Sequence, residues 1–230
     1  MIELVGVGEG KEYEAALHLR KQLLAVWPDL SQHPDDHVKI FVGLKLYGHP
    51  IEDIDLFVVG QFSEPRQFDI EFKFYPREGE PFVPRRASVR NFALVIEVKS
   101  HDATGVRFDD KVASVRYSRG WECVTEKARQ QVFELKKYLA RNGVPKIYLQ
   151  DLIFFSGLRE PDLPKRPHNC FGIDASFERI LNILGQVSSP ANNDRRVTLS
   201  FGSEDVFDSI FSSETALLQT MEPTPLDRRR

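Results

Sequence analysis

NFALVIEVKSH, at residues 91–101, is a continuous apolar run that ends abruptly in charged side chains. Such a run is typical of a central strand that is buried on both faces and whose last turn emerges at a site. Because side chains alternate along a strand, Glu97 and Lys99 point to the same side of the sheet. Burying charged groups costs free energy unless they are paired or bind a metal, so this strand end is a candidate functional cluster.

Two more strands are predicted ahead of this run. HVKIFVGLKLYG at residues 37–48 and IEDIDLFVVGQF at residues 51–62 are rich in Val, Ile and Phe and are separated by a Gly-His-Pro turn. They predict two strands of a hairpin or meander. The next segment, at about 61–92, alternates apolar and charged side chains and then becomes loop-like and rich in arginine, which predicts an inserted β-hairpin.

Helical spacing of apolar side chains marks the segments around this sheet. Residues 9–27 carry Ala16, Leu19, Leu23 and Leu24 at this spacing, which predicts an opening helix. The remaining elements are two short strands at 105–110 and 111–118, a helix at 124–143 with Thr125 as its N-cap, a strand at 146–157 and a helix at 176–186. This order predicts a mixed α/β domain with a central mixed sheet flanked by helices.

One domain is expected over residues 1–186. Residues 187–230 have the composition of a linker, then of one edge strand, VTLSFGS, and then of a Pro-rich, basic tail. We expect this tail to lead to a further domain or to work with an ATPase partner.

Composition narrows the class of protein. The 230 residues are 41% hydrophobic and 28% charged, which is ordinary for a globular domain. The net charge of -3 excludes a wholly basic nucleic-acid binder, so contacts with phosphate need local basic patches. The two cysteines are too few for a disulfide scaffold. Neither a signal peptide nor an apolar stretch of about 18 residues is present, so we expect a cytoplasmic chain with no membrane partner.

The sharpest chemical pattern combines Asp55, in DIDLFVV, with Glu97 and Lys99. Carboxylate oxygens on neighbouring strands are ligands suited to a hard cation such as Mg²⁺. A cation held there would polarise a phosphodiester and lower the pKa of an attacking water. Lys99, on the same side of the strand as Glu97, is expected to position that water or to neutralise charge that develops on the phosphate.

The chain resembles the nuclease-related domain (NERD) family of the PD-(D/E)xK nuclease superfamily. The resemblance rests on a first helix with a glutamate, then IDLFVV, then VIEVKS, then a helix that carries glutamine, and it covers roughly residues 9–155. It implies a restriction-endonuclease-like core and Mg²⁺-dependent endonuclease activity on nucleic acid, with DNA favoured over RNA and RNA kept as the alternative, and with Mn²⁺ able to substitute. It also implies a fused or associated ATPase or helicase.

The resemblance adds two catalytic residues to Lys99 and the metal ligands Asp55 and Glu97. Glu12 is the best match for the acidic residue of the first helix, because it shares the side of the apolar stripe; Glu9 and Glu14 are the alternatives. Gln131 lies on the apolar side of its helix and is expected to be a buried amide that needs a partner.

One departure from the family is the spacing between the two carboxylates. Asp55 and Glu97 are 42 positions apart (97 minus 55), longer than the family usually allows. If the insertion replaces the motif strand, Asp53 or Asp69 is the ligand instead of Asp55.

The insertion also carries an arginine cluster that is a candidate phosphate-contacting arm. Its members are Arg85, Arg86 and Arg90.

The alternative function is a catalytically inactive nucleic-acid-binding or scaffolding module attached to an ATPase or helicase. Intact Asp55, Glu97 and Lys99 favour the nuclease. Replacing Asp55 or Glu97 with alanine is expected to abolish cleavage and to preserve the fold, because each change removes a ligand without opening a large apolar cavity.

Overall fold

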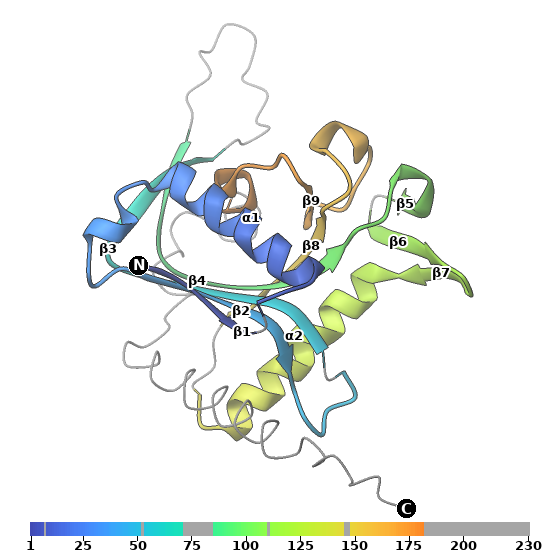
Figure 1. Ribbon diagram of the computed structural model, residues 1–230, viewed down its shortest axis with the longest axis horizontal. Coiled ribbons are helices and arrows are strands. Elements are labelled where there is room, and N and C mark those ends of the chain that lie inside the picture. The colour runs from blue at the N-terminus through green and yellow to red at the C-terminus, as the bar shows by residue number, and fades with distance from the viewer. Residues whose placement is uncertain (7, 52, 71–84, 110, 145–147, 182–230) are drawn as a thin grey trace, which may run out of the picture.

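The computed structural model describes the whole chain except residues 7, 52, 71–84, 110, 145–147 and 182–230. A six-stranded sheet in the order β1-β2-β3-β4-β8-β9 forms its centre (Figure 1). Its strands are β1 (Ile2–Gly6), β2 (His37–Lys45), β3 (Asp53–Ile70), β4 (Arg85–Lys99), β8 (Gln150–Phe155) and β9 (Cys170–Gly172). β2, β3 and β4 form an antiparallel meander, whereas β1 pairs parallel with β2 and β8 pairs parallel with β4 and β9. The predicted mixed α/β architecture is confirmed.

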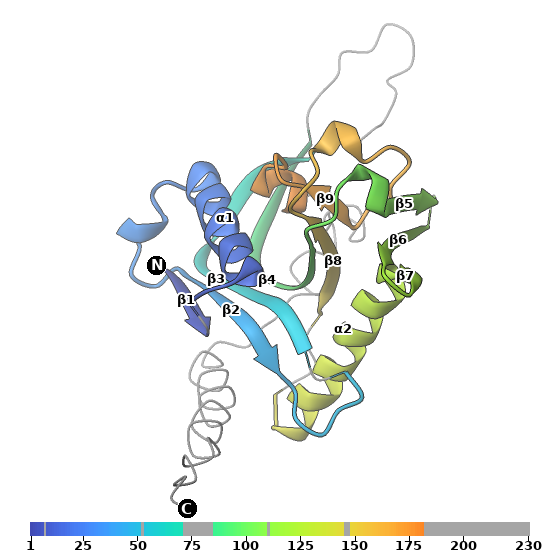
Figure 2. The same cartoon turned by 45° about the vertical axis from the view of Figure 1, so that its right-hand side comes forward.

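The two long helices cover opposite faces of this sheet (Figure 2). α1 (Lys11–Val26) packs Ala16, Leu19 and Leu23 against alternate residues of β2, β3 and β4. α2 (Val124–Arg141) packs its apolar stripe against the residues in between. The period of two along the strands thus divides their side chains between two cores. Of the stripe predicted for the first helix, Leu24 is the exception, because it is 36% exposed.

β3 and β4 are much longer than their neighbours. They pair from Leu56 opposite Ile96 to Ile70 opposite Arg85, with a shift in register between Gln61 and Arg66. The inserted segment therefore continues both strands as one hairpin. Gly60 is required here, since a Cβ at this position would lie 2.1 Å from the ring of Phe92.

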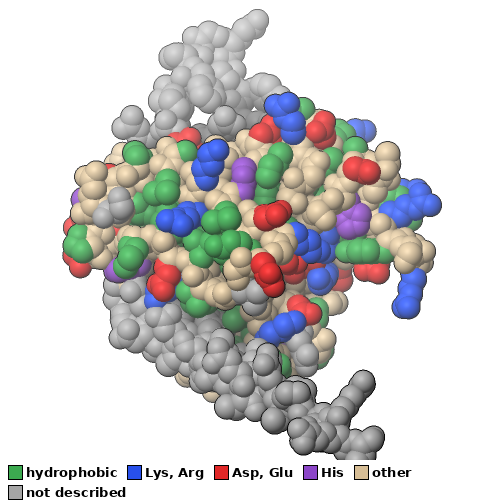
Figure 3. Space-filling model, in the orientation of Figure 1, with side chains coloured by type: hydrophobic (Ala, Val, Ile, Leu, Met, Phe, Trp, Pro, Cys, Tyr) green, Lys and Arg blue, Asp and Glu red, His purple; other side chains and the backbone are tan. Residues whose placement is uncertain are grey.

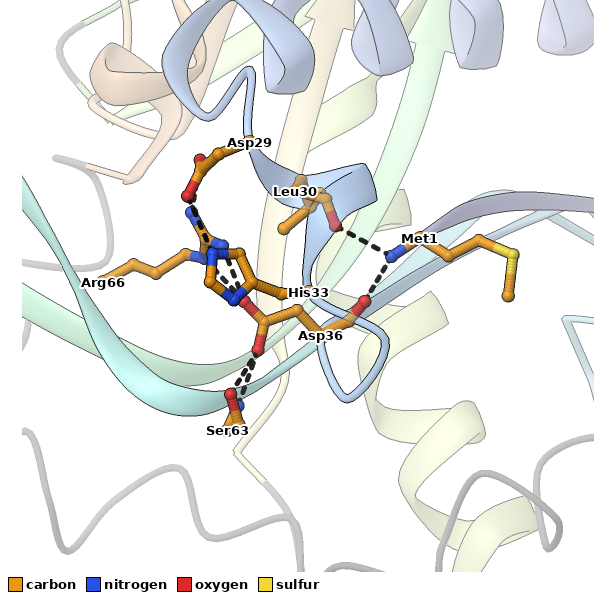
Figure 4. A network of polar contacts seen from close by, with 7 residues as sticks. All are labelled: Met1, Asp29, Leu30, His33, Asp36, Ser63 and Arg66. Atoms are coloured by element: carbon orange, nitrogen blue, oxygen red, sulfur yellow. Dashed lines mark hydrogen bonds and ion pairs between the residues drawn. The ribbon is translucent and has the colours of Figure 1, made fainter.

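A polar network fastens the base of this hairpin to the core (Figure 4). Arg66 donates to Asp36 at 2.6 Å and to Asp29 at 2.9 Å, and Asp36 also accepts from the backbone and hydroxyl of Ser63. The amino group of Met1 donates to backbone oxygens of the same loop, including that of Leu30 at 3.2 Å. The guanidinium is thus fixed by two carboxylates and is not free to bind a ligand.

A smaller three-stranded sheet lies between β4 and α2 in the sequence. It is antiparallel, in the order β5-β6-β7, and consists of β5 (Val106–Asp109), β6 (Val112–Tyr117) and β7 (Gly120–Cys123). One side packs Ala113 and Val115 against Ile153 and Phe155 of β8. The short helices are η1 (Leu30–Gln32), η2 (Ala103–Gly105) and η3 (Glu160–Asp162). No helix in the described part of the chain is long and apolar enough to cross a membrane.

Several sequence-based expectations change here. β1, β7 and β9 were not predicted, because each is short and lacks a repeating pattern. Thr125 is not the N-cap of α2: the helix follows Cys123, and the Thr125 hydroxyl accepts a hydrogen bond from the Ala113 backbone at 2.8 Å. The predicted helix at 176–186 is helical over 177–181. Its later residues, the VTLSFGS strand and the tail lie outside the described residues.

Candidate functional site

The site is built where β3 begins and β4 ends, beneath the first turns of α2. Glu97 and Lys99 lie on the side of β4 that faces α2, continuing the row that contains Ala93 and Val95. The register that pairs Leu56 with Ile96 places Asp55 opposite Glu97. Directly opposite residues on antiparallel strands have neighbouring side chains. The sheet therefore brings the two predicted carboxylates together.

Glu97 is the centre of the cluster. Its carboxylate is fully buried and has three side-chain partners. Oε1 accepts hydrogen bonds from Lys99 Nζ and, at 2.6 Å, from Lys127 Nζ, whereas Oε2 accepts from Gln131 Nε2 at 2.6 Å. Burial opposes ionisation of Glu97, but the two ammonium groups outweigh it and hold its pKa below the ordinary value.

Asp55 has the opposite electrostatic environment. Its Oδ2 accepts a hydrogen bond from the backbone N–H of Val98 at 2.7 Å. Burial, and then the charge of Glu97, raise the pKa of Asp55 to about 6, although Val98, Lys127 and Lys99 act against this shift. Two neighbouring carboxylates repel each other when no cation lies between them. Such a pair provides the oxygen ligands that a divalent cation requires.

Lys99 is held firmly in place. It is 6% exposed, and its Nζ lies 5.9 Å from the centroid of the Tyr117 ring. Burial alone would lower the pKa of Lys99, but the charge of Glu97 outweighs it and raises the pKa, so the side chain stays cationic. A buried, fixed ammonium group beside two carboxylates is suited to neutralising charge in a reaction.

α2 contributes two side chains one turn apart, Lys127 and Gln131. Gln131 is completely buried, as its position on the apolar side of the helix predicted. Its Nε2 bridges Glu97 and the backbone oxygen of Asp53 at 3.0 Å, while its Oε1 is buried without a partner among the described atoms. An unused buried acceptor suits a site that holds ordered water. Sequence analysis missed Lys127, although its spacing of four from Gln131 places both on one side of the helix.

Glu12 is not brought into this cluster. It lies on α1, which covers the opposite face of the sheet, and its carboxylate is 3.7 Å from Lys11 Nζ. The start of α1 does approach the end of β4 (Figures 1 and 2). No hydrogen bond or ion pair in the described part of the chain joins Glu12 to Asp55 or Glu97. Of the alternatives on the same segment, Glu9 and Glu14 are both exposed.

The alternative aspartates lie away from Glu97 as well. The Asp53 side chain is exposed and pairs with Lys45. The backbone of Asp69 pairs with Arg86, near the far end of β3. Asp55 is therefore the aspartate that this sheet places beside Glu97.

The predicted arginine arm lies toward the other end of β4. Arg85 is 12 positions before Glu97 (97 minus 85), at most about 40 Å along a strand. Its backbone and that of Arg86 pair with β3. Arg90, which is exposed, donates to the backbone oxygen of Ser63 at 3.1 Å. The arm is thus separated from the carboxylates by the length of the hairpin.

The donor set fits a divalent cation only in part. Across the described residues, no group of three or more His, Cys, Asp and Glu side chains surrounds a common point. Asp55 and Glu97 are two oxygen donors, and Mg²⁺ characteristically keeps several waters and needs only one or two carboxylates. The geometry therefore allows a hydrated Mg²⁺ once the lysines release Oε1 of Glu97.

Replacing Asp55 with asparagine is expected to stabilise the metal-free protein at neutral pH. A folded-state pKa near 6, against 3.8 for the free group, means that protonated Asp55 contributes stability below pH 3.8 that is lost as the pH rises through 6. Asparagine keeps a side-chain oxygen that can accept the hydrogen bond from the Val98 N–H, and it does not ionise, so the variant does not lose this stability as the pH rises. The free energy of unfolding of both proteins is measured with urea in a chelator at pH 4 and at pH 7.5. The difference between the variant and the wild type should be about 1–3 kcal/mol more favourable to the variant at pH 7.5 than at pH 4.

Asp53→Asn is the matched control, since it removes an exposed charge two positions away on the same strand. Its pH profile should follow that of the wild type. An Asp55→Asn profile parallel to the wild type would contradict the raised pKa.

Comparisons of the chain with protein-family models, with curated proteins and with solved structures gave no match.

Proposed function

We propose that the chain is a Mg²⁺-dependent nuclease with a PD-(D/E)xK-type site on a restriction-endonuclease-like core. The observation that carries this proposal is the juxtaposition of Asp55, Glu97 and Lys99 at the ends of two neighbouring strands. The element order supports it: α1, the antiparallel strands β2, β3 and β4, then α2, then β8 parallel to β4. This order is compatible with the restriction-endonuclease-like core that the resemblance to the NERD family implies.

Asp55 and Glu97 would hold the cation. When bound there, Mg²⁺ supplies polarisation of the phosphodiester and a lower pKa for the attacking water. Asp55 is kept in place by the Val98 N–H, and Glu97 by Gln131, so both ligands are oriented before substrate arrives. Preorganised ligands lose little freedom when the reaction begins.

The two lysines are suited to different tasks. The Lys99 side chain is 7% exposed and confined beside Glu97, whereas the Lys127 side chain is 42% exposed. Lys99 is therefore placed to neutralise charge at the reacting phosphate. Lys127 can leave Glu97 and bind a phosphate of the incoming strand, which would leave Lys99 as the one ammonium group on Oε1 of Glu97.

Lys127→Ala is expected to weaken substrate binding more than it slows the reaction. We expect KM to rise about tenfold, the scale of one lost charge-assisted contact, with kcat within about threefold of the wild type. Steady-state cleavage of a labelled oligonucleotide measures both. Lys136→Ala, which removes an exposed lysine from the same helix, should leave both constants unchanged. A fall in kcat with no change in KM would contradict this division of roles.

The test of the nuclease assignment is cleavage by purified wild type and Asp55→Asn protein. Plasmid, linear duplex, single-stranded DNA and RNA are each incubated with Mg²⁺, with Mn²⁺ and with a chelator. We expect cleavage by the wild type with either metal, and none by Asp55→Asn or with chelator. Asp53→Asn should cleave like the wild type. Equal activity of the Asp55→Asn protein would refute the assignment.

A second candidate is an inactive nucleic-acid-binding module attached to an ATPase or helicase. One observation favours it: both oxygens of Glu97 already have partners, two of them ammonium groups. Permanent lysines would occupy the place of the cation. Mn²⁺ titration followed by electron paramagnetic resonance separates the two functions, since only the nuclease binds the ion in a manner that Asp55→Asn abolishes.

A further inference from the structure

The outer side of the small sheet β5-β6-β7 has a different character from its inner side. Ala113 and Val115 of β6 are buried on the inner side. On the outer side, the register places Arg107 opposite Ser114, and Arg116 opposite Trp121. Directly opposite residues of an antiparallel sheet share a side. An aromatic ring and two arginines therefore lie together on the outer side.

Arg107 and Trp121 form a stacked pair. The guanidinium carbon of Arg107 lies 4.0 Å from the centroid of the Trp121 ring, and Arg107 is exposed. A guanidinium is planar, so a group stacked beneath it fixes its orientation and leaves its other side available. Bases of unpaired nucleic acid stack on aromatic rings and on arginine planes of this kind.

The two arginines of this surface, Arg107 and Arg116, differ from Arg66 in their partners. Arg66 also lies near aromatic rings, but Asp29 and Asp36 bind it. In contrast, neither Arg107 nor Arg116 makes an ion pair within the described part of the chain. The chain as a whole has a net charge of -3, so the positive charge of this patch is opposite in sign to that of the whole chain. Lys and Arg side chains stand out at the edge of the molecule where β5, β6 and β7 lie (Figure 3).

The small sheet is also adjacent to the carboxylate site. Tyr117 follows Arg116 on β6, and its ring centroid is 5.9 Å from Lys99 Nζ and 5.1 Å from that of the His101 ring. One end of β6 thus touches the candidate site from the inner side while it carries Arg116 on the outer side. A strand bound along the outer side would reach Lys99 by passing around the end of the small sheet at Tyr117.

We infer that the outer side of β5-β6-β7 binds a single polynucleotide strand. Arg107, backed by Trp121, stacks against a base, and Arg116 with Arg119 of the β6–β7 turn contacts phosphates. The binding stands on the geometry of the small sheet alone. That the strand is the substrate rests on the proposed nuclease function. The sheet would then deliver an unpaired strand, rather than a duplex, to Asp55 and Glu97.

The experiment measures binding in chelator, so that cleavage plays no part. Fluorescence anisotropy follows a labelled oligothymidine of about 20 nucleotides, its oligouridine equivalent, a duplex, and an abasic strand of equal length. Arg107→Lys keeps the positive charge but lacks the planar guanidinium group. It should weaken binding of oligothymidine about tenfold and leave the abasic strand unaffected, because only the former has bases to stack. Arg116→Ala should weaken both strands and reduce the salt slope by about 0.7.

Tryptophan emission supplies an independent readout. The chain has two tryptophans, and Trp27 is 5% exposed. Quenching on addition of oligothymidine should therefore come from Trp121 and disappear in Trp121→Phe. Lys136→Ala and Arg20→Ala, which remove exposed cations from the two helices, should bind oligothymidine like the wild type.

The outcomes separate the two proposals. Binding with the predicted variant pattern, but no cleavage in Mg²⁺, would leave this surface standing and refute the nuclease. Cleavage by the wild type with unchanged binding in Arg107→Lys and Arg116→Ala would refute the surface alone. Equal affinity for duplex and single strand would also overturn it, whereas a preference between oligothymidine and oligouridine identifies the strand as DNA or RNA.

Discussion

Glu97→Ala is expected to abolish metal-dependent cleavage and to lower the free energy of unfolding by about 3–5 kcal/mol. The first effect follows from the proposed role of Glu97 as a metal ligand. The second follows from the contacts of Glu97, which is fully buried and accepts hydrogen bonds from Lys99, Lys127 and Gln131. Without this carboxylate, the buried ammonium group of Lys99 loses the anion to which it is hydrogen-bonded. Urea denaturation and the nuclease assay measure the two effects.

A double variant distinguishes lost chemistry from lost folding. Glu97→Gln combined with Lys99→Met removes the buried charge together with its partner. The double variant should therefore recover much of the free energy of unfolding that Glu97→Ala loses, without restoring cleavage. Cleavage by Glu97→Ala within tenfold of the wild type would contradict the role of this residue. The sequence alone suggested that alanine at position 55 or 97 preserves the fold; the contacts of the two side chains restrict this to position 55.

Lys99→Ala is expected to cleave at least about 100-fold more slowly while still binding Mn²⁺. Asp55 and Glu97 both remain, and Lys127 continues to neutralise Glu97, so the folded state and the ligands persist. The slowing should lie in kcat, since the side chain is too buried to bind the strand in the ground state. Single-turnover cleavage and Mn²⁺ titration measure the two quantities.

Lys136→Ala serves again as the control on the same assays. A loss of Mn²⁺ affinity in Lys99→Ala as large as that in Asp55→Asn would show that Lys99 organises the ligands rather than acting on the phosphate. Such a result would mean that Lys99 positions Glu97 and does not itself take part in the reaction.

Four of the six strands of the central sheet, β2, β3, β4 and β8, and the two long helices could be predicted from the sequence alone. The apolar run at 91–101 predicted a buried strand, and the period of two along it placed Glu97 and Lys99 on one side. The stripe of the helix at 124–143 likewise identified Gln131 as a buried amide. These features depend on neighbours within one turn or one strand, which a sequence records directly.

Contacts between side chains of different strands and helices could be known only from the tertiary structure. It brought Lys127 to Glu97, placed Glu12 on the opposite face and turned the Thr125 hydroxyl toward β6 instead of the helix end. β1 gained its place only by pairing with β2, more than 30 residues later (38 minus 2). Such contacts depend on register and on the crossing of helix and sheet. Local periodicity specifies which side a residue takes, but not which distant residue lies opposite it.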